Sequence, residues 1–439
     1  MAQSRVAFGY PMKSAVVLLA ALVPAWAQLS VDPQLGAEIA KIKAIDNHAH
    51  PVRPPFDGLP KDTEFDALPV DVMDPYTEPV RTREGSPVVV EAWRELFGLS
   101  QAAEVQQRKR QLLHEKGDGY ANWVLDQLGI ETMLANRVAM GRGLAAPRFL
   151  WVPFVDALLF PLNNSSLAGE NSDRRTFFAD EDILRERYLK DCALPQTPAT
   201  LDEYLANVVT TTLERQKRAG AVAVKYEAAY LRSLEFDNVG RDEARQIYSH
   251  WRNSAPPEAT YKKLQDHIFR YIAAECGRLG LAVHIHAAYG AGGYFHVGGA
   301  NPMLLESVLN DPKLRKTNFV MLHGGWPFTR EVAALLSKPN AYADFSEQTF
   351  MNYPRTVAQD IREWLERAPE KVLFATDAYP FSEEMGWEEA GWVAATTGRQ
   401  ALGAALTCMM NDGEITRERA LEMARMVLRE NARKLYRLP

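Results

Sequence analysis

Short apolar runs recur along the chain, and most are followed by a stretch of helical spacing. Several runs are continuous rather than alternating, as expected for parallel strands buried on both faces. The predicted strands lie within residues 41–50, 129–138, 147–160, 219–230, 280–290, 317–325, 339–346 and 370–380. Helical spacing is clearest at residues 261–280, 301–312, 329–339 and 356–369. Eight strands that alternate with helices predict a (β/α)8 barrel of the α/β class.

The alternative architecture is an open, doubly wound sheet. That fold usually shows a glycine-rich nucleotide loop early in the chain, and this sequence has none there. The barrel is therefore the preferred prediction.

Two long segments interrupt the alternation of strands and helices. Residues 51–125 are rich in proline and then helical, and residues 160–215 form the second segment. Both follow a predicted strand, so in a barrel they would emerge on the catalytic face. We interpret them as walls or lids of a substrate site, with contacts in an oligomer as an equal alternative. Residues 28–439 then form one barrel domain with two mostly helical insertions.

The first 27 residues have the pattern of a secretory signal peptide. Lys13 precedes an apolar run that ends in Ala25-Trp26-Ala27, and this arrangement predicts cleavage before Gln28. The run is too short to span a bilayer comfortably, which argues against the alternative of a membrane anchor. We therefore expect an exported protein, periplasmic or secreted, with no membrane span in the mature chain.

Composition narrows the choice of partners. The chain has 439 residues, a formal net charge of −6 and a pI of about 5.9. No basic stripe with interleaved aromatic residues occurs, so we expect a small-molecule substrate rather than nucleic acid. A homo-oligomer is compatible with the sequence. The three cysteines, Cys192, Cys276 and Cys408, form neither a CxxC motif nor a disulfide framework.

Polar residues with catalytic potential lie at the ends of the predicted strands. Side chains two apart on a strand share a face, so His48 and His50 can both enter the barrel mouth. The other residues at strand ends are Lys225, His286, His323 and Asp377. Imidazoles and a carboxylate that converge from rigid elements form a transition-metal site, and a bound metal lowers the pKa of a coordinated water toward about 7. A single HxH pair is weak evidence; the order of these residues along the chain is the stronger signal.

The motifs that carry these residues resemble the amidohydrolase superfamily. They are "IDNHAHP", "HIHAAYG", "MLHGGWPFTREVAALLSKPNAYADFS" and "VLFATDAYPF". The chain is most similar to the amidohydrolase-related branch (amidohydrolase 2), which includes the amidohydrolase-like domain fused to type I glutamine synthetases. The resemblance covers residues 40–50 and 219–439 and leaves the two insertions unmatched.

The resemblance implies a role for each strand-end residue. His48 and His50 would bind the more buried metal together with Asp377, which also serves as general base. In two-metal members His286 and His323 bind a second ion, and Lys225 takes the place of the carboxylated lysine that bridges both. In one-metal members His286 completes the first site, and the strand-six histidine, here His323, binds or polarises the substrate.

The state of Lys225 stays open on the sequence alone. It could be carboxylated, or a free cation that faces an anionic substrate, or a structural partner of Glu227 or Asp344. The cofactor is one or two divalent ions, with zinc as first candidate and manganese or iron as alternatives. Tyr230, His296 and Trp326 follow strand ends and are candidates for substrate binding, although packing is an alternative for Trp326 and exposure for His296.

The predicted activity is metal-dependent hydrolysis of an amide or related C–N or C–O bond. Metal-activated hydroxide would attack a carbonyl-type carbon, and Asp377 would shuttle protons. A nonhydrolytic decarboxylase or isomerase of the same superfamily is the main alternative. A noncatalytic binding module is a further one, disfavoured because every expected ligand is present.

Overall fold

The eight predicted strands all occur, in the predicted order. The computed structural model describes residues 29–54, 61–68, 79–83, 85–382 and 384–439, so the predicted signal peptide lies outside the described residues. The strands are β1 (Ala44–Ala49), β2 (Ile130–Asn136), β3 (Phe149–Val152), β4 (Ala223–Tyr226), β5 (Ala282–His286), β6 (Phe319–Leu322), β7 (Ala341–Asp344) and β8 (Val372–Leu373). Each is shorter than the apolar run that predicted it, because the runs continue into buried loops at the strand ends.

The strands form two parallel sheets, with the orders β1-β2-β3 and β4-β5-β6-β7-β8. Backbone hydrogen bonds also cross both seams between these sheets. The amide of Lys225 donates to the Pro153 carbonyl at 2.8 Å, beyond the end of β3. The amide of Asp377, beyond β8, donates to the His48 carbonyl at 2.7 Å. The strands therefore follow one another around a ring in chain order, as a (β/α)8 barrel requires.

The barrel interior has its own apolar cluster, which is separate from the larger core between strands and helices. It draws on all eight strands: Ile45, Leu134, Val152, Ala223, Ala282, Val320, Leu322 and Leu373 are buried in it, and Tyr342 of β7 packs against it. Inward side chains from every strand fill the ring, so the barrel is a packed core and not a pore. Polar residues that belong to a site must then lie at a mouth of the barrel.

Helices cover the strands from outside. The helices that follow the barrel strands, and those at the two ends of the chain, are α1 (Pro33–Lys41), α9 (Ala228–Leu231), α10 (Arg241–Trp251), α11 (Glu258–Leu279), α12 (Glu306–Leu309), α13 (Thr329–Leu335), α14 (Gln348–Met351), α15 (Pro354–Leu365), α16 (Trp387–Asn411), α17 (Arg417–Arg425) and α18 (Asn431–Tyr436). The predicted helix at 301–312 is broken, because Pro302–Leu305 is a 3₁₀ turn ahead of α12. Helix α11 ends where predicted: Gly280 has φ +66°, a conformation that glycine adopts without strain.

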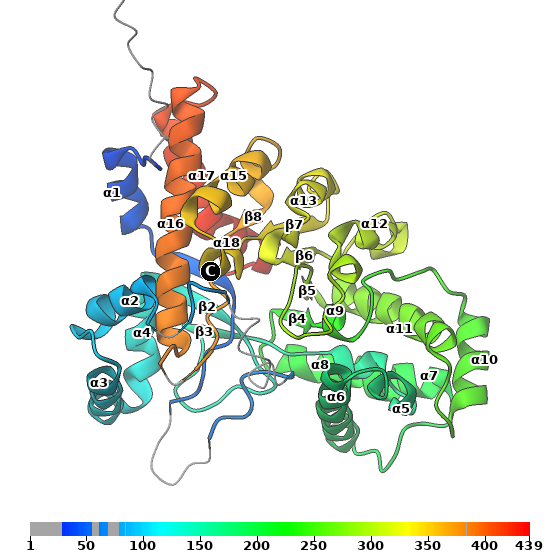
Figure 1. Cartoon of the computed structure of the whole chain (residues 1–439). Helices are drawn as coiled ribbons and strands as arrows, with labels where there is room; N and C mark the ends of the chain where they lie inside the picture. The colour runs from blue at the N-terminus through cyan, green and yellow to red at the C-terminus, as the bar shows by residue number, and fades with distance from the viewer. Residues whose placement is uncertain (1–28, 55–60, 69–78, 84, 383) are drawn as a thin grey trace, which may run out of the picture.

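The two insertions lie on opposite sides of the strands (Figure 1). The first carries α2 (Pro87–Phe97), α3 (Ala102–Lys116) and α4 (Tyr120–Leu128), and the second carries α5 (Ser165–Ala168), α6 (Ser172–Asp191), α7 (Leu201–Tyr204) and α8 (Thr211–Arg218). They follow β1 and β3, as predicted. An ion pair of 2.6 Å between Glu64 and Arg187 joins the described part of the first insertion to α6. No helix among the described residues is both long and apolar enough to cross a bilayer.

Candidate metal centre

A cavity of about 120 Å³ lies at the ends of the strands. Seven residues that were singled out from the sequence line it: His48, His50, Lys225, Tyr230, His286, His323 and Asp377. They come from five different strand ends and from α9, so the fold brings together residues that are more than 300 positions apart. Side chains held by rigid strands in this way are placed precisely enough to bind an ion.

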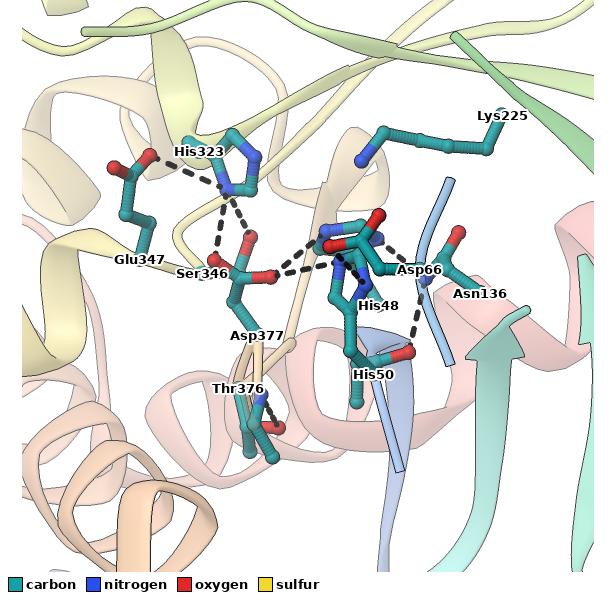
Figure 2. A network of polar contacts seen from close by, with 12 residues as sticks. His48, His50, Asp66, Asn136, Lys225, His323, Ser346, Glu347, Thr376 and Asp377 are labelled. Atoms are coloured by element: carbon teal, nitrogen blue, oxygen red, sulfur yellow. Dashed lines mark hydrogen bonds and ion pairs between the residues drawn. The ribbon is translucent and has the colours of Figure 1, made fainter. Parts of the chain in front are cut away.

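Asp377 is the centre of the polar contacts in the cavity (Figure 2). Its Oδ1 lies 2.9 Å from Nε2 of His48 and 3.5 Å from Nε2 of His50. Its Oδ2 lies 3.9 Å from Nδ1 of His323. Donor atoms of His48, His323 and Asp377 all lie within 4.8 Å of one another, as a shared ion would need.

A second group of donor atoms adjoins the first and shares His323 with it. His286, His323 and Glu347 offer ligand atoms within 4.8 Å of one another, and Glu347 Oε2 lies 3.7 Å from His323 Nδ1. Glu347 was not identified from the sequence, because it lies in a loop three residues beyond β7 and belongs to none of the motifs. Two adjoining groups leave room for one or two ions.

Burial keeps the four imidazoles neutral. It lowers the pKa of His48, His50 and His323 well below the usual value, and that of His286 to about 3. Neutral imidazole is the form that binds a metal ion, because one ring nitrogen keeps its lone pair. Nδ1 of His50 is also buried without a hydrogen-bond partner, and Nε2 of His48, although 2.9 Å from Asp377 Oδ1, makes no hydrogen bond of good geometry. Such atoms are rare in a finished core, and a bound cation would satisfy them.

Burial has the opposite effect on the carboxyl group of Asp377. It raises the pKa of Asp377 to about 8, with the nearby Asp344 carboxylate adding to the effect. A carboxylate that is costly to ionise alone is stabilised by a bound cation. The donor set, imidazole nitrogens with one or two carboxylates, fits a divalent transition metal.

His323 is held in place by a buried network beneath the cavity. Ser346 Oγ lies 2.8 Å from His323 Nδ1 and donates to Oδ1 of Asp344 at 2.6 Å. The same carboxylate oxygen accepts the backbone amide of His323 at 2.9 Å. Asp344, at the end of β7, therefore fixes both the backbone of His323 and, through Ser346, its ring.

Three residues of the site have an unusual backbone conformation. His323, Glu347 and Asp377 have φ between +54° and +63°, in the left-handed region that residues with a Cβ seldom adopt. Each follows the end of a strand, where a sharp turn aims the side chain into the cavity. Strain of this kind persists where the surroundings enforce it and is common in functional sites.

The family profile described as Amidohydrolase (Amidohydro_2) matches residues 185–438, more than half of the chain. The chain belongs to the amidohydrolase family. Protein fluG of Emericella nidulans is 32% identical to this amidohydrolase over 142 residues. That match covers 32% of this chain and 15% of protein fluG.

Solved structures with the same fold cover almost the whole amidohydrolase chain. Glucuronate isomerase from Caulobacter crescentus matches with a TM-score of 0.60 and 15% identity over 92% of this chain and 93% of its own. A protein from Lactobacillus casei ATCC 334 that is proposed to be a metal-dependent hydrolase also has this fold. It matches with a TM-score of 0.60 and 16% identity over 93% of this chain and 98% of its own. At these identities the likeness shows the fold alone.

Lys225 of the amidohydrolase does not stand alone in the cavity. Its Nζ lies 3.3 Å from Oε1 of Glu227, the pairing that was one of three alternatives from the sequence. A further acid, Asp66, enters from the first insertion, with Oδ2 3.6 Å from Nδ1 of His50. Sequence analysis placed that insertion near the site but identified no residue in it, because no motif marks Asp66.

Two predicted substrate contacts are not brought into this cavity. His296 is exposed and lies in a neighbouring hollow between α6 and the loop after β5, which shares Tyr230 and Ala291 with the cavity. Trp326 packs against Tyr289, with ring centroids 5.9 Å apart, and does not line the cavity. Both lie in loops beyond the strand ends, where the position in the chain does not fix the direction of a side chain. His284 is buried one layer below and its Nε2 lies 2.7 Å from the hydroxyl of Tyr436.

Proposed function

We propose that this amidohydrolase is a metal-dependent hydrolase that cleaves an amide or related C–N or C–O bond. The observation that carries the proposal is the convergence of His48, His323 and Asp377, buried at the mouth of a parallel barrel, with His50 and His286 beside them. His48, His50 and Asp377 would hold the first divalent ion, and His286, His323 and Glu347 would hold a second where one is present.

A divalent ion held by these residues would supply Lewis-acid chemistry: it would polarise a carbonyl oxygen and lower the pKa of water. Asp377 is placed to handle protons, because Oδ1 faces His48 and His50 while Oδ2 faces His323. We assign it the role of general base: it takes a proton from the attacking water and returns it to the leaving nitrogen or oxygen. His323 lies between the two groups of ligands and can orient the carbonyl oxygen of the substrate.

One observation favours a second candidate, a nonhydrolytic lyase or isomerase. The carboxyl group of Glu227 lies 3.3 Å from Nζ of Lys225, where it would repel a carbamate on that nitrogen. A free lysine suits a one-metal site and an anionic substrate. The two candidates differ in their products, because hydrolysis releases an amine or alcohol, decarboxylation releases carbon dioxide and isomerisation releases neither.

The proposal is tested with the zinc-loaded protein and a panel of chromogenic anilides and esters. We expect release of the leaving group, and a loss of about a hundredfold or more in Asp377→Asn, since general-base catalysis typically contributes 10²–10⁴-fold. Asp242→Asn is the matched control, because Asp242 lies on α10 with 88% of its side chain exposed. Full activity of Asp377→Asn, or carbon dioxide as the only product from matched carboxylates, would contradict the hydrolase proposal.

A further inference from the structure

The cavity is acidic. Among its described lining residues are four carboxyl groups (Asp66, Glu227, Glu347 and Asp377), one lysine and no arginine. Burial alone disfavours their ionised form, and a bound divalent ion favours it. Sites that recognise a substrate carboxylate usually present arginine in a bidentate contact, and none of the described residues here does so.

We infer that the substrate carries an ammonium group close to the bond that is cleaved, joined to an aromatic or apolar part. This inference rests on the proposed hydrolase function and names the substrate class for the same site. Two of the carboxylates, Asp66 and Glu227, are outside the two groups of candidate metal ligands. They are the residues that would receive the ammonium group.

Lys225 does not offset these acids as a free anion-binding group. Its ammonium lies 3.3 Å from Glu227 Oε1 and 5.8 Å from the centre of the Phe154 ring. Its charge is therefore already paired inside the protein. A substrate carboxylate would have to compete with Glu227 for it, at close range to Asp66.

Glu227 has acceptor capacity left over. Glu227 is 5% exposed, and its Oε2 is buried without a hydrogen-bond donor. Asp66 is fixed by the backbone amides of Ala67 and Leu68, which both donate to Oδ1 at 2.7 and 3.3 Å, so that Oδ2 faces the cavity beside His50 (Figure 2). Buried carboxylate oxygens without donors are costly, and a substrate ammonium supplies three N–H donors.

The rest of the lining suits the apolar part of such a substrate. Aromatic rings surround the opening, from Tyr230, Tyr289, Phe350, Tyr379 and Phe381. Ring faces also attract cations when the site excludes water. The combination of desolvated carboxylates and aromatic walls favours an organic cation over a neutral or anionic group of the same shape.

The test uses three matched hydroxamates, because this group binds the metal itself and keeps the anchor constant. Phenylalanine hydroxamate carries an amine, 3-phenylpropionohydroxamate carries hydrogen in its place, and 2-benzylmalonic acid monohydroxamate carries a carboxylate. Affinity for the zinc-loaded protein is measured by calorimetry at about pH 7, below the α-amine pKa of about 8. We expect the amine to bind about tenfold tighter than the hydrogen compound, as one desolvated charge contact of about 1.4 kcal/mol gives, and the carboxylate to bind weakest.

Glu227→Gln should reduce the preference for the amine to about threefold or less. Unchanged binding of 3-phenylpropionohydroxamate would show that the variant is folded and still holds zinc. Glu64→Gln is the charge-matched control, because Glu64 pairs with Arg187 outside this cavity, and it should keep the preference. Equal affinities, or tightest binding of the carboxylate, would overturn the inference and leave the hydrolase proposal standing. If none of the three binds, the metal site itself is contradicted, and the inference with it.

Discussion

At the scale of single residues, His48 is a candidate metal ligand with one ring nitrogen held by a neighbouring side chain. Nδ1 of His48 lies 2.6 Å from the side-chain amide of Asn136, which also contacts the carbonyl of Ala49 at 3.2 Å. The amide oxygen of Asn136 has no partner of its own. Rotation of the amide would exchange its bond to the Ala49 carbonyl for one from Nδ1–H to this oxygen, in the tautomer of His48 that leaves Nε2 for a metal.

Asn136 should therefore be a positioning residue for the metal. Asn136→Leu is expected to weaken zinc affinity by about 10–100-fold, as loss of partners to metal-binding histidines does elsewhere. Competition with a chelator of known affinity measures this, and unfolding in urea controls for stability. Zinc affinity equal to wild type in a folded Asn136→Leu protein would contradict the assignment.

A residue far from the cavity gives a pH prediction. Burial raises the pKa of Asp360 to about 6, although the hydroxyl of Thr329 donates to it at 2.8 Å. The unfolded chain has a value of about 3.9, so the folded protein binds this proton more tightly. The stability that the proton confers is present below about pH 4 and is lost as the pH rises through 6.

Asp360→Asn keeps a neutral side chain at every pH and should remove this loss of stability at higher pH. The difference in free energy of unfolding between Asp360→Asn and wild type should grow by up to about 3 kcal/mol from pH 4 to 7, the equivalent of a shift of about two pKa units. Urea unfolding across that range measures it, with the exposed Asp242→Asn as control. A difference that does not change with pH would contradict the prediction.

The residues found from the sequence are those that end a strand. His48 and His286 could be placed because alternation along a parallel strand fixes both the face and the end at which a side chain emerges. Asp377, four residues beyond β8, was found through its motif. Glu347 and Asp66 could not be placed, since each lies in a loop whose path depends on long-range packing. The same limit affected Trp326 and His296, which were candidates for substrate binding with packing and exposure as their alternatives, and which lie beside the cavity.

At the scale of elements, the first insertion is tied to the barrel by a buried charge cluster. Lys109 of α3 lies 2.7 Å from Glu389 and 3.5 Å from Glu388, both on α16. The hydroxyl of Tyr120, at the start of α4, donates to Glu388 at 2.7 Å. The two carboxylates share one ammonium in a place that little water reaches.

Removal of this ammonium should be costly, because two buried carboxylates would remain unpaired. Lys109→Met is expected to lower the free energy of unfolding by about 3 kcal/mol, the usual cost of breaking a buried ion pair from one side. Arg110→Met on the exposed face of the same helix should change it by less than about 0.5 kcal/mol. Chemical denaturation of both variants checks this, and equal stabilities would show that the cluster does not hold α3 to α16.

The elements themselves were predictable in type and order but not in extent. The run at 370–380 predicted a full strand, yet β8 spans only Val372–Leu373, because the chain turns at Asp377 with φ +54° to form the site. The helix at 301–312 gave way to a 3₁₀ turn at Pro302 for a similar local reason. Function and proline chemistry override the apolar pattern at these points.

At the scale of the whole molecule, the barrel fixes the site and the insertions surround it. Alternation of strands and helices was enough to predict eight parallel strands and insertions after the first and third. It could not predict that the described part of the first insertion brings Asp66 to the cavity, because such contacts depend on the packing of segments with no repeat. The signal peptide and export remain predictions from residues 1–27.

The central claim is that this cavity binds a divalent metal through His48, His323 and Asp377. The most direct test is the metal content of the purified full chain and of His48→Ala, measured by plasma mass spectrometry after dialysis with zinc. We predict at least one equivalent per wild-type chain, and loss of bound metal in His48→Ala with its circular dichroism unchanged. Less than one equivalent in the wild type, or wild-type metal content in the variant, would contradict the account.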